Sequence, residues 1–127
     1  ERGKEMKRVI LCTGKVYYDL LEKREELGIK DVTFIRLEQL APFPQDALQE
    51  ALTYFPNAEF IWCQEEPRNM GAWNYVHDKI EQAKEDGHLK CMKPRYIGRP
   101  EAASPATGFV RVHEREQQAL VTEALTG

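Results

Sequence analysis

Four short, almost uninterrupted apolar runs constrain the fold of this 127-residue chain more than any other feature. The runs cover residues 7–13, 32–37, 60–63 and 95–98. A strand with one face in water alternates apolar and polar residues, whereas runs without alternation indicate strands buried on both faces, as in parallel sheets. The sequence therefore predicts a covered, mainly parallel sheet.

Helical patterns separate these runs. Apolar residues recur with a period near 3.6, which predicts helices, over residues 15–27, 44–55, 72–85 and 114–125. Gly28 offers a left-handed cap to the first helix, Pro44 is a favoured first-turn residue of the second, and Asp46 lies near the positive end of that helix's dipole. Strands and helices in alternation predict the α/β class, as a three-layer α/β/α sandwich with right-handed crossovers.

The length of the chain fits one domain, and neither a repeat nor a linker divides residues 1–127. Residues 1–6 are a polar lead-in without an initiating methionine, so we expect the chain to be part of a longer polypeptide. The net charge of −3 argues against a nucleic-acid or acidic-membrane partner, because either needs a dense basic face. No apolar run is long enough to cross a bilayer.

Cysteine usage indicates the redox compartment. Of Cys12, Cys63 and Cys91, two lie inside apolar runs, and no pair has C-x-x-C spacing. An odd number of widely spaced cysteines predicts reduced thiols, not a disulfide framework. We therefore expect a cytoplasmic protein if the source is bacterial, and one of the mitochondrial matrix if it is eukaryotic.

The loops that follow the predicted strands are the candidate functional region. In open α/β sheets, ligands and partners meet the loops at the carboxyl ends of the strands. These loops are residues 14–15, 38–44, 64–73 and 98–108. The last two are longer than simple connections need to be, so we expect function at this edge of the sheet.

Known catalytic motifs are missing from the sequence. Residues 13–15 resemble a phosphate loop, but Val16 stands where Ser or Thr should hold magnesium. His113 begins a zincin-like pattern whose second ligand is replaced by Gln117. Ser104 lacks the glycines of a nucleophile elbow. We therefore predict no catalytic, cofactor-binding or metal-binding residue in this chain.

The adjacent carboxylates Glu65 and Glu66 favour a structural or interface role. Neighbouring residues of an extended segment point to opposite faces, so these two do not form a close acid–base dyad. We expect one of them to pair with Arg68, Arg95 or Arg99, or to cap the following helix. Ion-pair networks also gather at such edges.

Aromatic residues near the same loops indicate contact surfaces. Trp, Tyr, Met and Arg are enriched at the buried centres of protein interfaces. For Trp62 we predict core packing. For Trp73, core packing and an interface role are equally compatible with the sequence.

The loops and the strands before them resemble the C-terminal domain of the thiamin-dependent first component of the 2-oxoglutarate dehydrogenase complex, in its bacterial form. The resemblance rests on four ordered blocks, at residues 7–21, 36–44, 62–73 and 96–108, followed by His113 and the helix at 117–121. The run Gln-Glu-Glu-Pro-Arg-Asn-Met-Gly-Ala-Trp at residues 64–73 is the most diagnostic. This domain is similar to the C-terminal domain of transketolases.

The resemblance implies a role outside the active centre. Members of the family are homodimers that bind thiamin diphosphate and Mg in two upstream domains. They decarboxylate 2-oxoglutarate and pass a succinyl group to the lipoyl-bearing succinyltransferase component of the complex. The chain is then a single C-terminal domain of a larger enzyme. It would support the reaction through packing against the upstream domains and through dimer contacts, and it would be inactive alone.

Two sets of residues follow for this edge. As interface residues we expect Gln64, Glu65, Glu66, Asn69, Trp73, Arg99 and Ser104. An alternative is a regulatory pocket for an anionic nucleotide or acyl-CoA effector, because cationic side chains near a helix N-terminus bind anions. Its residues would be Lys15, Arg95, Arg99, Ser104 and Thr107. A further alternative is the same domain of a 2-oxoadipate dehydrogenase.

Overall fold

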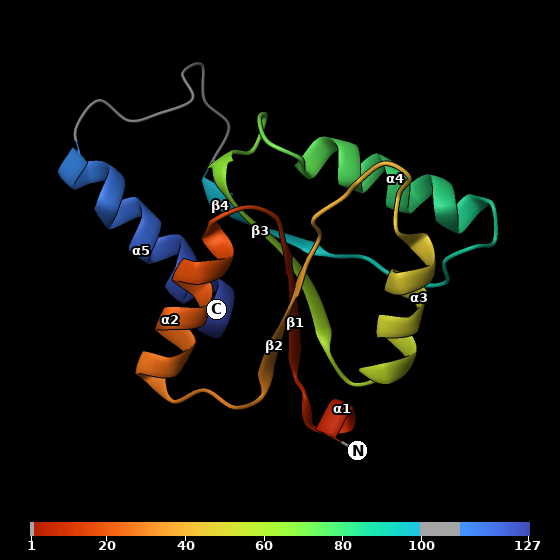
Figure 1. Ribbon diagram of the computed structural model, residues 1–127, viewed down its shortest axis with the longest axis horizontal. Helices are drawn as coiled ribbons and strands as arrows, with labels where there is room; N and C mark the ends of the chain where they lie inside the picture. Colours follow the sequence, from red (N-terminus) through yellow and green to blue (C-terminus); the bar gives the residue numbers. More distant parts are fainter. Residues whose placement is uncertain (1, 100–109) are drawn as a thin grey trace.

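The computed structural model of the chain describes residues 2–99 and 110–127 (Figure 1). Its elements alternate between helix and strand in the predicted order. In sequence they are α1 (Arg2–Glu5), β1 (Arg8–Cys12), α2 (Val16–Leu27), β2 (Val32–Arg36), α3 (Gln45–Tyr54), β3 (Glu59–Pro67), α4 (Trp73–Glu85), β4 (Arg95–Arg99) and α5 (Val110–Thr126).

The four strands form one parallel sheet in the order β2-β1-β3-β4. In the register, Ile10 of β1 lies opposite Phe34 of β2 and Ile61 of β3. The connection through α3 carries the chain from β2 back across β1 to β3. Helices α2 and α5 cover one face of the sheet, and α3 and α4 cover the other (Figure 1). The predicted three-layer α/β/α sandwich is confirmed.

The two faces of the sheet bury two separate apolar cores. Alternate residues of β1 point to opposite faces: Val9 and Leu11 belong to the core under α3 and α4, and Ile10 and Cys12 to the core under α2 and α5. Trp62 of β3 lies in the first core and is fully buried, as predicted. Because both faces are covered, residues 9–12 of β1 and 60–63 of β3 are all apolar, which explains the runs without alternation.

The helix termini follow the local sequence signals. Gly28 ends α2 with φ 69°, and its N–H donates to the Arg24 carbonyl, as expected of a left-handed cap. Asp46 lies in the first turn of α3. Pro44 immediately precedes α3 and does not lie in its first turn.

Three differences from the prediction exceed one residue. A short helix, α1, occupies residues expected to be an irregular lead-in, and α5 begins at Val110 and not at 114. Strand β3 continues to Pro67, four residues past the predicted end, because its polar end still pairs with β4 after a register shift between Cys63 and Pro67. Within the described residues, no helix is both long enough and apolar enough to span a bilayer.

Candidate functional site

The sheet topology creates one crevice position at the carboxyl edge. After β1 the chain turns to α2 on one face, and after β3 it turns to α4 on the other face. Between such neighbouring strands the two loops diverge, and ligand sites of open α/β sheets lie there. Here the diverging segments are Gly14–Lys15 and the end of β3 with the loop to α4, which contains the most diagnostic run of the sequence.

Gln64 organises the loop between β3 and α4. Its side chain is 2% exposed, and its Oε1 accepts from Trp62 Nε1 at 2.8 Å and from the Trp73 backbone N–H at 3.1 Å. Its Nε2 lies 2.8 Å from the carbonyls of both Pro67 and Met70, and 3.1 Å from that of Glu66. One buried amide therefore satisfies backbone groups along the whole loop and fixes its shape.

Gly71 completes this loop, because a side chain there would be strained and would crowd Glu66 and Gln64. Its φ is +69°, a left-handed conformation that favours glycine. A Cβ at this position would lie 2.9 Å from Glu66 Oε1 and 3.2 Å from both amide atoms of Gln64. The loop thus closes tightly over the Gln64 side chain, and sequence inspection of a single glycine does not reveal such a contact.

Trp73 belongs to the core of the domain. It is 6% exposed, and its ring lies 5.5 Å from that of Tyr96 in β4. The Tyr96 hydroxyl donates to the Arg99 carbonyl at 2.6 Å, and burial raises the pKa of Tyr96 to about 12. Arg68 stacks its guanidinium over the Tyr96 ring, 4.8 Å from the centroid. Within the domain, therefore, the Trp73 side chain packs into the core. The exposed tip of the loop is formed by Glu66, Arg68 and Asn69.

Glu65 and Glu66 face opposite sides of β3, as predicted. The Glu65 carboxylate turns toward α2 and α5, where its Oε1 lies 3.5 Å from Lys15 Nζ and 3.1 Å from Gln117 Nε2. Glu66 is exposed on the side of Gly71. Glu65 therefore takes a lysine where we expected an arginine.

The predicted arginines make other contacts. Arg99 is 8% exposed, donates from Nη1 to the Glu65 carbonyl, and places Nε 3.1 Å from Glu116 Oε1 of α5. Arg95 begins β4, so it lies about 13 Å from Arg99 at the rise of a strand. Its Nε is 2.7 Å from Glu59 Oε2, at the amino edge of the sheet. The prediction that Arg95 shares the carboxyl edge with Lys15 and Arg99 is wrong, because Arg95 is the first residue of its strand.

A pocket of about 310 Å³ lies at the crevice between β1 and β3. Its lining residues are Lys15, Asp19, Glu65, Glu114, Gln117 and Gln118. Three of these side chains are carboxylates and one is an ammonium, so the pocket attracts cations and repels anions. Gln117 donates to Asp19 Oδ2 at 2.8 Å as well as to Glu65, and so joins α5 to α2 and β3.

In the sequence, Gln117 stands where a zincin-like pattern would have its second ligand and begins the closing helical block of the resemblance. Its partners lie 52 and 98 residues away in the chain, so nothing in its sequence neighbourhood indicates them. Ser104 and Thr107 lie outside the described residues. Asn69 is exposed at the loop tip. In the part of the chain that the structure describes, no three His, Cys, Asp or Glu side chains gather as a metal site would require.

Comparison with known proteins gives a consistent result. The family model described as 2-oxoglutarate dehydrogenase C-terminal matches residues 1–125. The "2-oxoglutarate dehydrogenase E1 component" proteins of Brucella anthropi, Brucella ovis and Brucella melitensis are each 48% identical over 125 residues. Each match covers 98% of this chain and 12% of the relative, so the chain spans about an eighth of the length of these proteins.

Proposed function

Because this chain belongs to the 2-oxoglutarate dehydrogenase C-terminal family, we propose that it supports the thiamin diphosphate-dependent oxidative decarboxylation of 2-oxoglutarate from outside the active centre. Its contribution is packing against the upstream domains of the same enzyme and contact with the second subunit. The observation that carries this proposal is the match itself, which covers residues 1–125 here but only 12% of each relative. The remaining length holds the rest of the enzyme.

The geometry of the carboxyl edge supports a contact role. The buried amide of Gln64 and the close approach at Gly71 hold the loop between β3 and α4 in one shape. At its tip Glu66, Arg68 and Asn69 are exposed. A loop that is already ordered loses little entropy when a partner binds it, so such a loop suits an interface.

The edge pocket does not suit the diphosphate of thiamin diphosphate. A diphosphate needs cationic or N–H donors, and the edge pocket instead presents the carboxylates of Asp19, Glu65 and Glu114. We place thiamin diphosphate and its Mg in the upstream domains and assign no catalytic step to this chain. The wider assembly, with the lipoyl-bearing succinyltransferase component, and the bacterial cytoplasm as its location are parts of the same proposal, in keeping with the bacterial relatives.

The same charges do not favour a pocket for an anionic effector. Lys15 faces the Glu65 carboxylate, Arg99 faces Glu116, and Arg95 lies at the opposite edge with Glu59. Nor do the named relatives favour 2-oxoadipate, since each carries the name of the 2-oxoglutarate enzyme. The supporting role in a 2-oxoglutarate enzyme is therefore the function we retain.

The first test compares turnover of 2-oxoglutarate by the full-length enzyme and by the isolated domain. We expect thiamin-dependent decarboxylation only in the full-length enzyme. Turnover of another 2-oxo acid but not of 2-oxoglutarate would overturn the substrate, and turnover by the isolated domain would overturn the supporting role.

A second test addresses the contact surface. Glu66→Lys in the full-length enzyme should weaken the dimer or reduce turnover, because it reverses the charge of an exposed side chain at the loop tip. Glu85→Lys is the matched control, since Glu85 is exposed at the end of α4, at the opposite edge of the sheet. Equal behaviour of the two variants in sedimentation velocity and in turnover would remove the loop tip from the interface. Trp73→Ala is a poorer test, because it also empties part of the core.

A further inference from the structure

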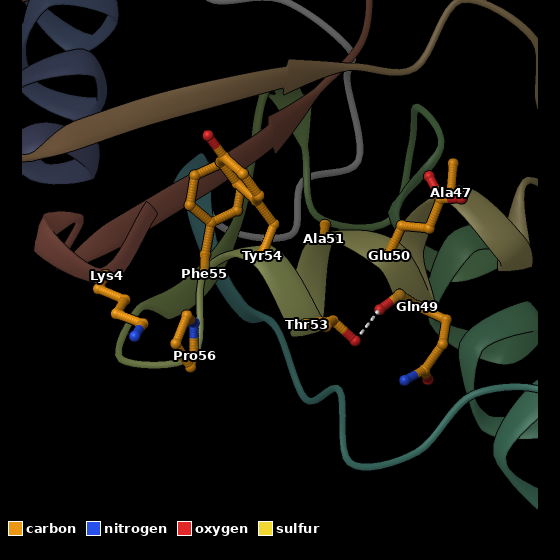
Figure 2. Close-up of a pocket in the computed structure, with 9 residues that line it drawn as sticks. All are labelled: Lys4, Ala47, Gln49, Glu50, Ala51, Thr53, Tyr54, Phe55 and Pro56. Carbon is orange, nitrogen blue, oxygen red and sulfur yellow. Dashed lines mark hydrogen bonds between the residues drawn. The ribbon is translucent and has the colours of Figure 1, made fainter. Parts of the chain in front are cut away.

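An apolar groove runs along the outer side of α3, from its first turn to the segment that follows it. Its volume is about 740 Å³, and Figure 2 shows the side chains that line it. They are Lys4, Ala47, Gln49, Glu50, Ala51, Thr53, Tyr54, Phe55 and Pro56. Tyr54 is 58% exposed, and its ring meets that of Phe55 edge-on at 4.8 Å. An exposed tyrosine beside Phe55 and Pro56 is the kind of surface that another segment of protein covers.

Helix α1 is fixed against the wall of this groove. A Cβ on Gly3 would collide with the Tyr54 carbonyl and lie 2.9 Å from its ring, so only glycine permits this approach. Asn57 Nδ2 donates to the Lys4 carbonyl at 3.0 Å and holds the other side of the short helix. Lys4 itself lines the groove, at the end opposite Ala47 and Glu50 (Figure 2). The backbone that enters the domain is therefore anchored at the rim of the groove.

The length of the matched relatives points to a candidate occupant of the groove. The matched relatives are about eight times as long as this chain, since it covers 12% of each, and the family is described as the C-terminal part. The rest of such a protein reaches this domain through α1. A segment tethered at the rim has a local concentration in the millimolar range even through a flexible linker, so weak apolar contacts suffice to hold it.

We propose that the groove of α3 is covered by the upstream part of the same polypeptide, in the same subunit, with apolar side chains on Tyr54, Phe55 and Pro56. This assignment rests on the proposed function, in which the chain is one domain of a longer enzyme. Beyond that function, the assignment specifies which surface of this domain the upstream part covers. The exposed charges of Lys4 and Glu50 lie at the two ends of the groove and favour an occupant with an acidic group near Lys4 and a basic group near Glu50.

Photocrosslinking in the full-length enzyme tests this assignment. The variant Tyr54→p-benzoylphenylalanine places the reactive group in the groove. Leu27→p-benzoylphenylalanine is the matched control, because Leu27 is 47% exposed at the last residue of α2, on the opposite face of the sheet and away from the carboxyl edge. After irradiation, a denaturing gel separates products within one subunit from those between subunits, and mass spectrometry identifies the attached peptide.

We expect the Tyr54 variant to form a product at the mass of one subunit, joined to a peptide upstream of residue 1, in several-fold higher yield than the Leu27 variant. A second change, Ala47→Arg, should remove this product by filling the groove with a charge. Ala119→Arg, at an exposed alanine of α5, should not. A product at twice the subunit mass, a product with another protein, or a yield no higher than that of the control would each overturn the assignment.

Turnover of the unmodified full-length enzyme separates this assignment from the proposed function. An enzyme inactive on 2-oxoglutarate that still forms the product would sink the substrate and keep the groove assignment. An active enzyme without the product would do the reverse.

Discussion

Replacing Gln64 by leucine should strongly destabilise the 127-residue chain, although leucine is apolar and similar in size. The variant Gln64→Leu removes the acceptor of Trp62 Nε1 and of the Trp73 backbone N–H, and both hydrogen bonds are buried. It also removes the donor of the Pro67 and Met70 carbonyls. A leucine side chain offers none of these groups a partner.

The size of the effect follows from the number of groups left without a partner. A buried donor without its acceptor costs about 1–3 kcal/mol, so the two donors alone cost about 2–6 kcal/mol. Greater apolar burial by leucine offsets part of this, and the carbonyls add to it. We expect a net loss of about 4 kcal/mol, which is a large share of the roughly 5–15 kcal/mol that stabilises a domain.

Equilibrium unfolding in urea, followed by tryptophan fluorescence, measures this loss. With a slope of about 2 kcal/mol per molar urea, the midpoint should fall by about 2 M. The control Gln49→Leu removes one exposed hydrogen bond, from the Lys90 backbone N–H at 2.9 Å, which water can replace. It should cost about 1 kcal/mol or less. A Gln64→Leu midpoint as high as that of the control would refute the view that this amide holds the loop together.

Three further outcomes follow from the structure. Gly71→Ala should destabilise the chain more than Gly87→Ala. Both glycines have positive φ, which costs about 1–2 kcal/mol for alanine, but of the two only a Cβ on Gly71 would meet neighbours within 4 Å. Equal urea midpoints of the two variants would contradict this. The hydrogen bond from Arg95 lowers the pKa of Glu59, so its stabilisation is present above the unfolded pKa of about 4.3 and is lost as pH falls through the folded value. In urea titrations, the advantage of the unmodified chain over Glu59→Gln, below about 1 kcal/mol for an exposed pair, should therefore be complete above about pH 5 and shrink as the pH falls below about 4.3. Burial raises the pKa of the strand thiols of β1 and β3 to about 12, so at pH 8 a thiol reagent should modify only the exposed Cys91 in the folded chain and all three cysteines after unfolding; rapid modification of more than one in the folded chain would contradict the burial.

Part of the candidate site could be predicted from strand order. Apolar runs such as residues 7–13 place the loops after them at one edge, because all strands are parallel. The opposite orientations of Glu65 and Glu66 also follow from the two-residue period of a strand. The prediction for Arg95 was wrong, although the parallel order of the strands determines its position. A residue that begins a parallel strand lies at the amino edge of the sheet.

The contacts that set the shape and the charge of this edge could not be predicted from the sequence. Gln64, Glu65 and Glu66 are polar in sequence and indicate a loop. They instead continue β3, because β4 pairs again at Pro67 and the loop that folds over Gln64 satisfies its amide. Lys15 is a cation beside a helix start and suggests an anion site. The carboxylates brought to it by β3 and α5 reverse that expectation.

The sequence by itself determined the class of fold, the order of its elements and the edge where the loops gather, because burial and helical or strand periodicity act over neighbouring residues. Only the tertiary structure decided which charges meet and which surfaces stay open. Gln117 donates to Asp19, which lies 98 residues away in the sequence, and Gly3 of α1 lies against Tyr54 at the end of α3. Such pairings depend on how the helices pack across the sheet, so the residues next to each partner in the sequence do not indicate the other partner.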